Sequence, residues 1–100
     1  NLKYIKGLTL LKREDGFESS FWIYSVLVDN KDLFYKHMGN HGIAVSQVHE
    51  RNDKHTCVRE FVCNLPNLDK TIGKMVSIPV GWWVTTEDRQ YIVDTIKKGW

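Results

Sequence analysis

Hydrophobic and polar positions are patterned most regularly between Ser20 and Val28. Alternate residues of this stretch fall on two faces of an extended chain, with Trp22, Tyr24, Val26 and Val28 on one and Phe21, Ile23 and Leu27 on the other. Because both faces are apolar, the pattern predicts a central strand that is covered on each side. Shorter apolar stretches predict three further strands, at Leu8 to Leu11, Ile43 to Val48 and Val76 to Ile78.

The spacing of apolar residues changes to a helical period after Val28, which predicts a helix over Asn30 to His41. Asp29 or Asn30 is placed to cap its N-terminus, and Gly42 is placed to end it. The positions that repeat at helical intervals are Leu33, Phe34, His37, Met38 and His41.

A second helix is predicted over Thr86 to Lys98, with Tyr91, Ile92, Thr95 and Ile96 as its buried stripe. Thr85 and Asp88 have the spacing of a capping box, and Gly99 follows the last turn. Helix-like intervals also occur from Asn64 to Lys74, where Pro66 suits the first turn.

The order of these elements predicts a single α+β domain over residues 1–100. The strand 20–28, the helix 30–41 and the strand 43–48 are expected to form a compact β-α-β unit. The periodicity is lost from His49 to Asn64, which predicts mostly loop or a short strand around Val58 to Val62. The expected architecture is a two-layer sandwich, in which helices cover a small, mostly antiparallel sheet.

Composition adds few constraints on function. One hundred residues with 42% hydrophobic content suit one small domain, and a net charge of +2 gives no electrostatic reason to expect nucleic acid or an anionic membrane. Residues 1 to 15 are charged throughout, unlike a signal peptide. The two cysteines, Cys57 and Cys63, are expected to be reduced, partly buried thiols of a cytoplasmic protein.

Seven consecutive polar residues, His49 to His55, follow the predicted strand 43–48 and place charged groups at the rim of the sheet. Arg51 has the planar fork that binds phosphate or carboxylate by two hydrogen bonds, although pairing with Glu50 or Asp53 is the alternative. His49, Asn52 and His55 are candidates for hydrogen bonds to the same ligand. For His49 the alternative is a structural histidine bonded to a backbone carbonyl.

Other chemistry is disfavoured by spacing. His49, His55, Cys57 and Cys63 lack the paired intervals of a zinc site, so no metal ligands are assigned. No base is fixed beside either thiol for nucleophilic catalysis. Trp82 and Trp83 follow a Pro-x-Gly turn, where they suit either stacking on a ring or filling a seam against another domain.

Three motifs in order resemble a known family. The first is Trp22-x-Tyr24, Lys31-Asp32-x-Phe34 and Gly42-Ile43; the second is Val48-His49-x-Arg51; the third is Ser77 to Asp88, followed by Tyr91-Ile92-Val93. Together they are similar to the C-terminal small domain of the DegT/DnrJ/EryC1/StrS aminotransferases. The resemblance runs in register from Leu8 to Lys98.

The resemblance implies a function for the longer protein. Members of that family are fold-type I, pyridoxal-phosphate enzymes that transfer an amino group from an amino donor to nucleotide-linked keto-sugars. The resemblance also implies a cytoplasmic homodimer. Their large N-terminal domain supplies the Schiff-base lysine and the other cofactor ligands. None of the ten lysines here matches the cofactor-lysine motif, so no catalytic or cofactor-binding residue is assigned and this chain alone is not expected to transaminate.

For the small domain, the resemblance implies that Arg51, His49, Asn52 and His55 border the mouth of the active site and contact the nucleotide-sugar substrate. The alternative interpretation is a free-standing α+β module that binds nucleic acid or protein. Stacking of bases on Trp and Tyr would suit nucleic acid, but the aromatic and basic residues share no single face of the predicted elements.

Overall fold

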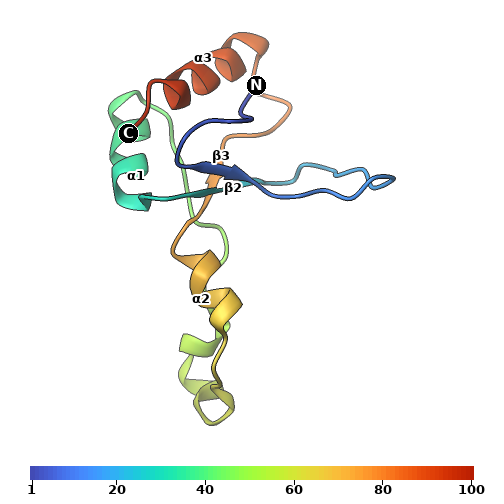
Figure 1. Cartoon of the computed structure of the whole chain (residues 1–100), viewed down its shortest axis with the longest axis vertical. Helices are drawn as coiled ribbons and strands as arrows, with labels where there is room; N and C mark the ends of the chain where they lie inside the picture. Colours follow the sequence, from blue (N-terminus) through green and yellow to red (C-terminus); the bar gives the residue numbers. More distant parts are fainter.

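The computed structural model describes residues 1–100 and contains a three-stranded antiparallel sheet in the order β1-β2-β3. The strands are β1 (Leu8–Leu10), β2 (Tyr24–Val28) and β3 (Met75–Ile78). Two helices, α1 (Lys31–Asn40) and α3 (Thr86–Lys97), pack against this sheet (Figure 1). The predicted α+β class, the antiparallel sheet and both long helices are therefore confirmed.

The core lies between the helices and one face of β2, the predicted central strand. Val26 and Val28 of β2 are fully buried, together with Phe34 and Met38 of α1 and Ile96 of α3. The opposite face is only half-buried and is partly polar, because the hydroxyls of Ser25 and Ser77 lie 3.2 Å apart across β2 and β3. Helices thus cover one face of the sheet, as in the predicted two-layer sandwich, and β2 is its central strand as predicted. The other face of β2 is less buried than the predicted covering on each side.

The strand β2 begins four residues later than the predicted start at Ser20. Phe21 has a φ of 50°, which an extended strand does not allow, and its N–H is donated to the Ser19 hydroxyl at 3.2 Å instead of to a neighbouring strand. Trp22 is consequently 75% exposed and does not share the buried face of Val26 and Val28.

Helix α1 begins and ends where its capping residues predict. The Asn30 side chain accepts a hydrogen bond from the Leu33 N–H at 3.0 Å. At the other end Gly42 has a φ of 71°, and the Ile43 N–H is donated to the Met38 carbonyl at 2.9 Å. This is the Schellman arrangement, which satisfies the last carbonyls of the helix and directs the chain back to the sheet.

Helix α3 is held by the predicted capping box between Thr85 and Asp88. Ile92, Thr95 and Ile96 are buried as predicted. Tyr91 differs from the prediction, because its ring is 49% exposed and its hydroxyl is donated to the His41 carbonyl at 3.0 Å. Its phenol therefore joins α3 to the end of α1 at the surface.

The predicted strand over Ile43 to Val48 does not form. Only Ser46 pairs with β3, through two backbone hydrogen bonds to Ser77 of 3.1 and 2.7 Å. Ile43 is buried but Val48 is exposed, and the Gln47 side chain hydrogen-bonds both Lys31 and the His49 carbonyl. Because this segment buries little apolar surface, it lies along the edge of β3 as a single bridge, and the β-α-β unit is incomplete.

Two arms extend from the body (Figure 1). The hairpin arm comprises residues 11–23, between β1 and β2. The helical arm comprises residues 49–74 and contains the 3₁₀ helices η1 (Asn52–Lys54) and η2 (Thr56–Phe61) and the short helix α2 (Pro66–Ile72). Pro66 occupies the first turn of α2 as expected, whereas the strand suggested near Val58 to Val62 is wrong because η2 occupies that region.

The helical arm lengthens the molecule to 48 Å along its longest axis. No helix in the chain combines the length and the apolar character needed to cross a bilayer.

Candidate functional site

The polar segment His49 to His55 lies where the helical arm leaves the body, and Arg51 organises it. The Arg51 Nε donates to one carboxylate oxygen of Asp53 at 2.8 Å, and Nη2 donates to the other oxygen. The remaining terminal nitrogen, Nη1, donates to Asp69 of α2. One guanidinium therefore joins the start of the arm to the helix that returns toward the sheet.

This arrangement favours the charged forms of Arg51 and Asp53. The hydrogen bonds from Arg51 hold the pKa of the Asp53 carboxyl below its usual range, and the same bonds with Asp53 and Asp69 raise the pKa of the guanidinium. Only 18% of the Arg51 side chain is exposed. The alternative of pairing with Asp53 is thus present in the structure, and Asp69 is a second partner that the sequence did not indicate.

The other three candidate residues are exposed and have no hydrogen bond through their side chains: His49, Asn52 and His55. The His49 ring meets the Trp22 ring edge-on, with centroids 6.4 Å apart. It is not the carbonyl-bonded structural histidine that was the alternative. All three side chains are available to a ligand.

The structure brings only some of these residues together. Arg51 and Asn52 line one hollow of about 400 Å³ in the helical arm, whose apolar side is formed by Val58, Phe61, Leu65 and Leu68. His49 instead lines a larger groove of about 950 Å³ beside the hairpin arm. His55 lines neither of these two cavities.

The groove beside the hairpin arm has a feature that the sequence did not indicate. The Arg13 guanidinium lies 4.3 Å from the centre of the Phe21 ring and 5.7 Å from that of Tyr24. A guanidinium over an aromatic face is held by cation–π attraction while its N–H groups stay free. Arg13 therefore adds a positive charge to the lining of the groove that His49 also lines.

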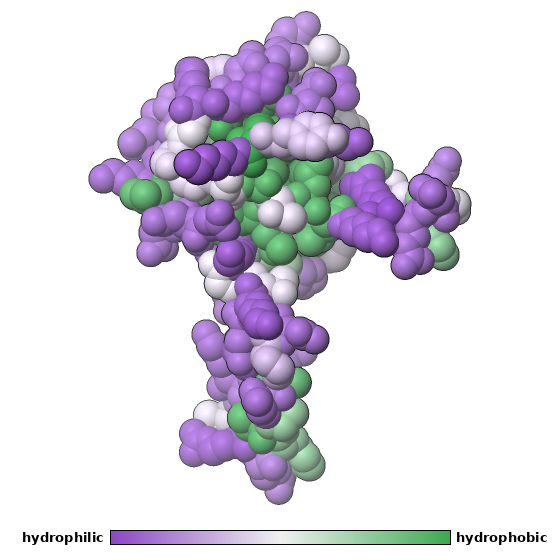
Figure 2. Space-filling model, viewed as in Figure 1, coloured by the Kyte–Doolittle hydropathy of each residue, from purple (hydrophilic) through white to green (hydrophobic).

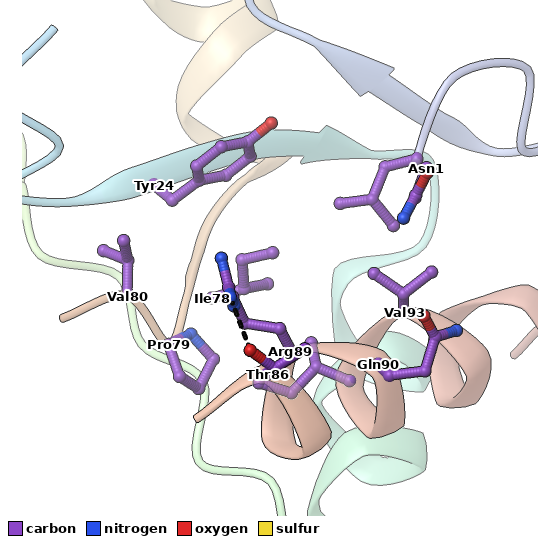
Figure 3. A pocket seen from close by; sticks show the side chains of 11 residues that line it. Asn1, Tyr24, Ile78, Pro79, Val80, Thr86, Arg89, Gln90 and Val93 are labelled. Carbon is purple, nitrogen blue, oxygen red and sulfur yellow. Dashed lines mark hydrogen bonds between the residues drawn. The ribbon is translucent and has the colours of Figure 1, made fainter. Parts of the chain in front are cut away.

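A further groove of about 450 Å³ lies between the sheet and α3 (Figure 3). Tyr24 of β2 and Arg89 of α3 both line it (Figure 3). Arg89 donates to the Thr86 hydroxyl at 2.9 Å and has no carboxylate partner.

The two cysteines are both exposed free thiols, in contrast to the partial burial expected of them. Cys57 lies in η2 and Cys63 follows it on the helical arm, where no core is close enough to bury them. The structure gathers no three histidine, cysteine or acidic side chains that would hold a metal ion.

Comparison with solved structures gives close matches over nearly the whole chain. AtS13 from Actinomadura melliaura is 44% identical, with a TM-score of 0.95, over 99% of this chain and 26% of its own. The sugar aminotransferase CalS13 from Micromonospora echinospora is 42% identical, with a TM-score of 0.95, over 99% of this chain and 27% of its own. Over nearly its whole length this chain matches the small domain of an aminotransferase.

The resemblance indicated by the three sequence motifs is thereby confirmed at the level of an aminotransferase small domain. DesV from S. venezuelae shares the fold at 13% identity, with a TM-score of 0.85, over 97% of this chain and 27% of its own. No family model and no curated protein matches the sequence. The chain spans about a quarter of the length of the aminotransferases that it matches.

Aminotransferases of this kind imply pyridoxal phosphate, but the residues of this small domain do not fit that cofactor. Nine of the ten lysines are exposed, so none presents its amine inside an enclosed site. The exception, Lys31, is half-buried, and its Nζ donates to the Gln47 side chain and to the Ile72 carbonyl at 3.4 Å. None of the ten lysines is therefore placed to form a Schiff base with that cofactor.

Proposed function

We propose that this chain is the C-terminal small domain of a pyridoxal-phosphate aminotransferase that acts on a nucleotide-linked keto-sugar. The observation that carries the proposal is the identity of 44% and 42% to two aminotransferase chains across 99% of this one, together with the description of one of them as a sugar aminotransferase. The large domain that binds the cofactor would precede residue 1, and the active enzyme would be a cytoplasmic homodimer. Two exposed, unpaired thiols are in keeping with a reducing compartment.

Within this enzyme, the base of the helical arm contributes contacts at the rim of the substrate site. His49, Asn52 and His55 supply side-chain donors and acceptors that no residue of the chain uses. Such groups suit the hydroxyl groups of a sugar and the oxygens of a diphosphate. Arg51 adds a positive charge whose orientation is fixed by Asp53 and Asp69.

Arg51 has N–H groups left for a ligand. Three of its five N–H donors are directed at the two carboxylates, so two remain for a phosphate oxygen or for the carboxylate of the amino donor. Because the carboxylates already hold the guanidinium in place, little side-chain entropy is lost when the substrate binds.

The experiment is steady-state kinetics of the full-length parent with Arg51→Ala. The variant should raise the KM for the sugar nucleotide about tenfold, as expected for the loss of a charge-assisted contact. Arg59→Ala is the matched control, because Arg59 is exposed on η2 of the same arm and has no ion pair.

Asn52→Ala distinguishes a loss of substrate contact from a disturbed fold of the arm. The Asn52 side chain makes no hydrogen bond within the chain, so its removal should leave the arm intact. It should raise KM while leaving the thermal unfolding midpoint unchanged. If both Arg51→Ala and Asn52→Ala leave kcat and KM at the wild-type values, Arg51 and Asn52 do not contact the substrate.

A further inference from the structure

Two histidines at the end of α1 lie one helical turn apart. Three residues separate His37 from His41, the C-cap of the helix, so both side chains lie on the same face. The centres of their rings are 4.6 Å apart. The pair lies where α1 meets α3 (Figure 1), because the His37 ring is bonded to Thr95 of α3. These two histidines line none of the cavities described above.

Hydrogen bonds fix the tautomer of each ring. The Nε2 of His37 lies 2.8 Å from the Thr95 carbonyl oxygen, and the Nδ1 of His41 lies 2.8 Å from the His37 carbonyl oxygen. A carbonyl oxygen only accepts hydrogen bonds, so each of these two nitrogens carries a proton and donates it. In the neutral rings the other nitrogens, Nδ1 of His37 and Nε2 of His41, therefore keep a free lone pair.

Histidines that bind metal ions have this arrangement. A metal-bound imidazole coordinates through one nitrogen and donates its other N–H to a backbone carbonyl or a carboxylate, which orients the ring and makes the coordinating nitrogen more basic. Both rings here already have a carbonyl partner. Two nitrogens that each lie about 2.0–2.1 Å from one ion are at most about 4.2 Å apart. Rings whose centres are 4.6 Å apart can supply two nitrogens at that separation.

The histidine pair is accessible to a dissolved ion. Both side chains are half-buried, so part of each ring is in contact with water. The surface over α3 is largely polar, whereas the apolar side chains gather below it in the body (Figure 2). The rings are thus held by the fold and remain open to solvent.

We propose that His37 and His41 bind one divalent transition-metal ion, through Nδ1 of the first and Nε2 of the second. Imidazole nitrogens suit Ni²⁺, Cu²⁺ and Zn²⁺, and Cu²⁺ is bound most tightly by such ligands. No third histidine, cysteine or acidic side chain joins the pair, so water fills the remaining coordination positions. Because the His37 ring is also bonded to Thr95, the ion holds the end of α1 against α3.

The test is a calorimetric titration of the 100-residue chain with Ni²⁺. The chain should bind one equivalent, and its thermal unfolding midpoint should rise with the Ni²⁺ concentration, since only the folded chain holds the two ligands together. His37→Gln and His41→Asn remove the coordinating nitrogens, while their side-chain amides can still donate to the two carbonyls. Loss of an outer-shell hydrogen bond alone lowers metal affinity about tenfold, so each variant should weaken binding by more than about tenfold.

The exposed thiols are the other soft ligands of the chain, and the double variant Cys57→Ser, Cys63→Ser is the matched control. It should bind Ni²⁺ with the wild-type affinity and stoichiometry. The inference is overturned if the wild-type chain does not bind Ni²⁺, if His37→Gln and His41→Asn bind it as tightly as the wild type, or if the double cysteine variant abolishes binding.

The paramagnetism of Ni²⁺ provides a second readout that needs no substitution. The NMR signals of His37, His41 and the neighbouring Thr95 should broaden first as Ni²⁺ is added, while those of the helical arm stay sharp. Broadening that begins instead at His49 or His55 would place the ion elsewhere and overturn the inference.

Discussion

Arg51 at the base of the helical arm is paired with Asp69, which lies eighteen residues further along the chain on α2. The pair links the first and last parts of the helical arm. The residues between them form η1, η2 and the start of α2, and none of these elements has a buried side chain. The order of the arm therefore depends on a polar contact more than on a core. A single substitution in this pair should therefore change the dynamics of the arm.

Asp69→Asn is expected to loosen the helical arm without destabilising the body. Exposed ion pairs contribute little to global stability, so the thermal midpoint should stay within the error of the wild type. Hydrogen exchange should become faster in residues 52–65 and remain unchanged in β2 and α1. Asp94→Asn, which removes the 3.9 Å pair with Lys97 on α3, serves as the control. If residues 52–65 exchange at the same rate in both variants, the Arg51–Asp69 pair does not order the arm.

The protonation of Asp53 provides a test of the same cluster by pH. Because Arg51 lowers the folded-state pKa of Asp53 below the unfolded value of about 3.9, the pair stabilises the arm fully above that value. The stabilisation is lost as the pH falls through the lower, folded-state pKa. A carboxyl titration followed by NMR should show Asp53 titrating below the ordinary range, and Arg51→Met should return its pKa to that range. An unchanged titration in Arg51→Met would exclude the pairing.

The capping box of α3 should be measurable as stability. Thr85→Ala removes the hydroxyl that accepts the Asp88 N–H at 3.0 Å, and caps of this kind contribute about 1 kcal/mol. Urea unfolding of the chain should show a loss of that size. Thr56→Ala is the control, because Thr56 begins η2 without any capping bond and should change the free energy of unfolding much less.

The two tryptophans after β3 give a spectroscopic prediction. A Cβ at Gly81 would lie 2.5 Å from the Trp83 ring, so Gly81→Ala must displace that ring. Trp83 is 63% exposed, so its movement should cost little, within about 0.5 kcal/mol. The edge-on Trp82–Trp83 pair, with centroids 5.9 Å apart, should lose its near-ultraviolet circular dichroism signal. Gly73→Ala meets no atom within 4 Å and should preserve that signal; loss of the signal in both variants would contradict this geometry.

The elements that the sequence predicted correctly are those with local signals. Asn30 and Gly42 mark the ends of α1, and the Thr85–Asp88 box marks the start of α3, because capping bonds involve residues three to five apart. The strand expected at Ile43 to Val48 failed because this segment buries little apolar surface, so that only Ser46 pairs with β3. Its alternation of apolar residues carries no information about that partner.

The candidate site shows the same limit. The sequence placed Arg51 in a polar segment and offered Glu50 or Asp53 as its partner, since both lie within two positions of it. It could not name Asp69, nor the approach of Arg13 to Phe21 and Tyr24, because those contacts depend on how the arms fold. The exposed thiols were missed for a related reason: cysteines are usually buried, but Cys57 and Cys63 lie on an arm without a core.

Amino transfer by the full-length parent tests the central claim most directly. The purified parent, supplied with pyridoxal phosphate, an amino donor and a nucleotide-linked keto-sugar, should form the nucleotide-linked amino sugar, detected by mass spectrometry. The 100-residue chain assayed in parallel should form none, because none of its lysines lies in a site for the cofactor. A parent that forms no amino sugar with any nucleotide-linked keto-sugar, or an isolated chain that transaminates, would contradict the proposed function.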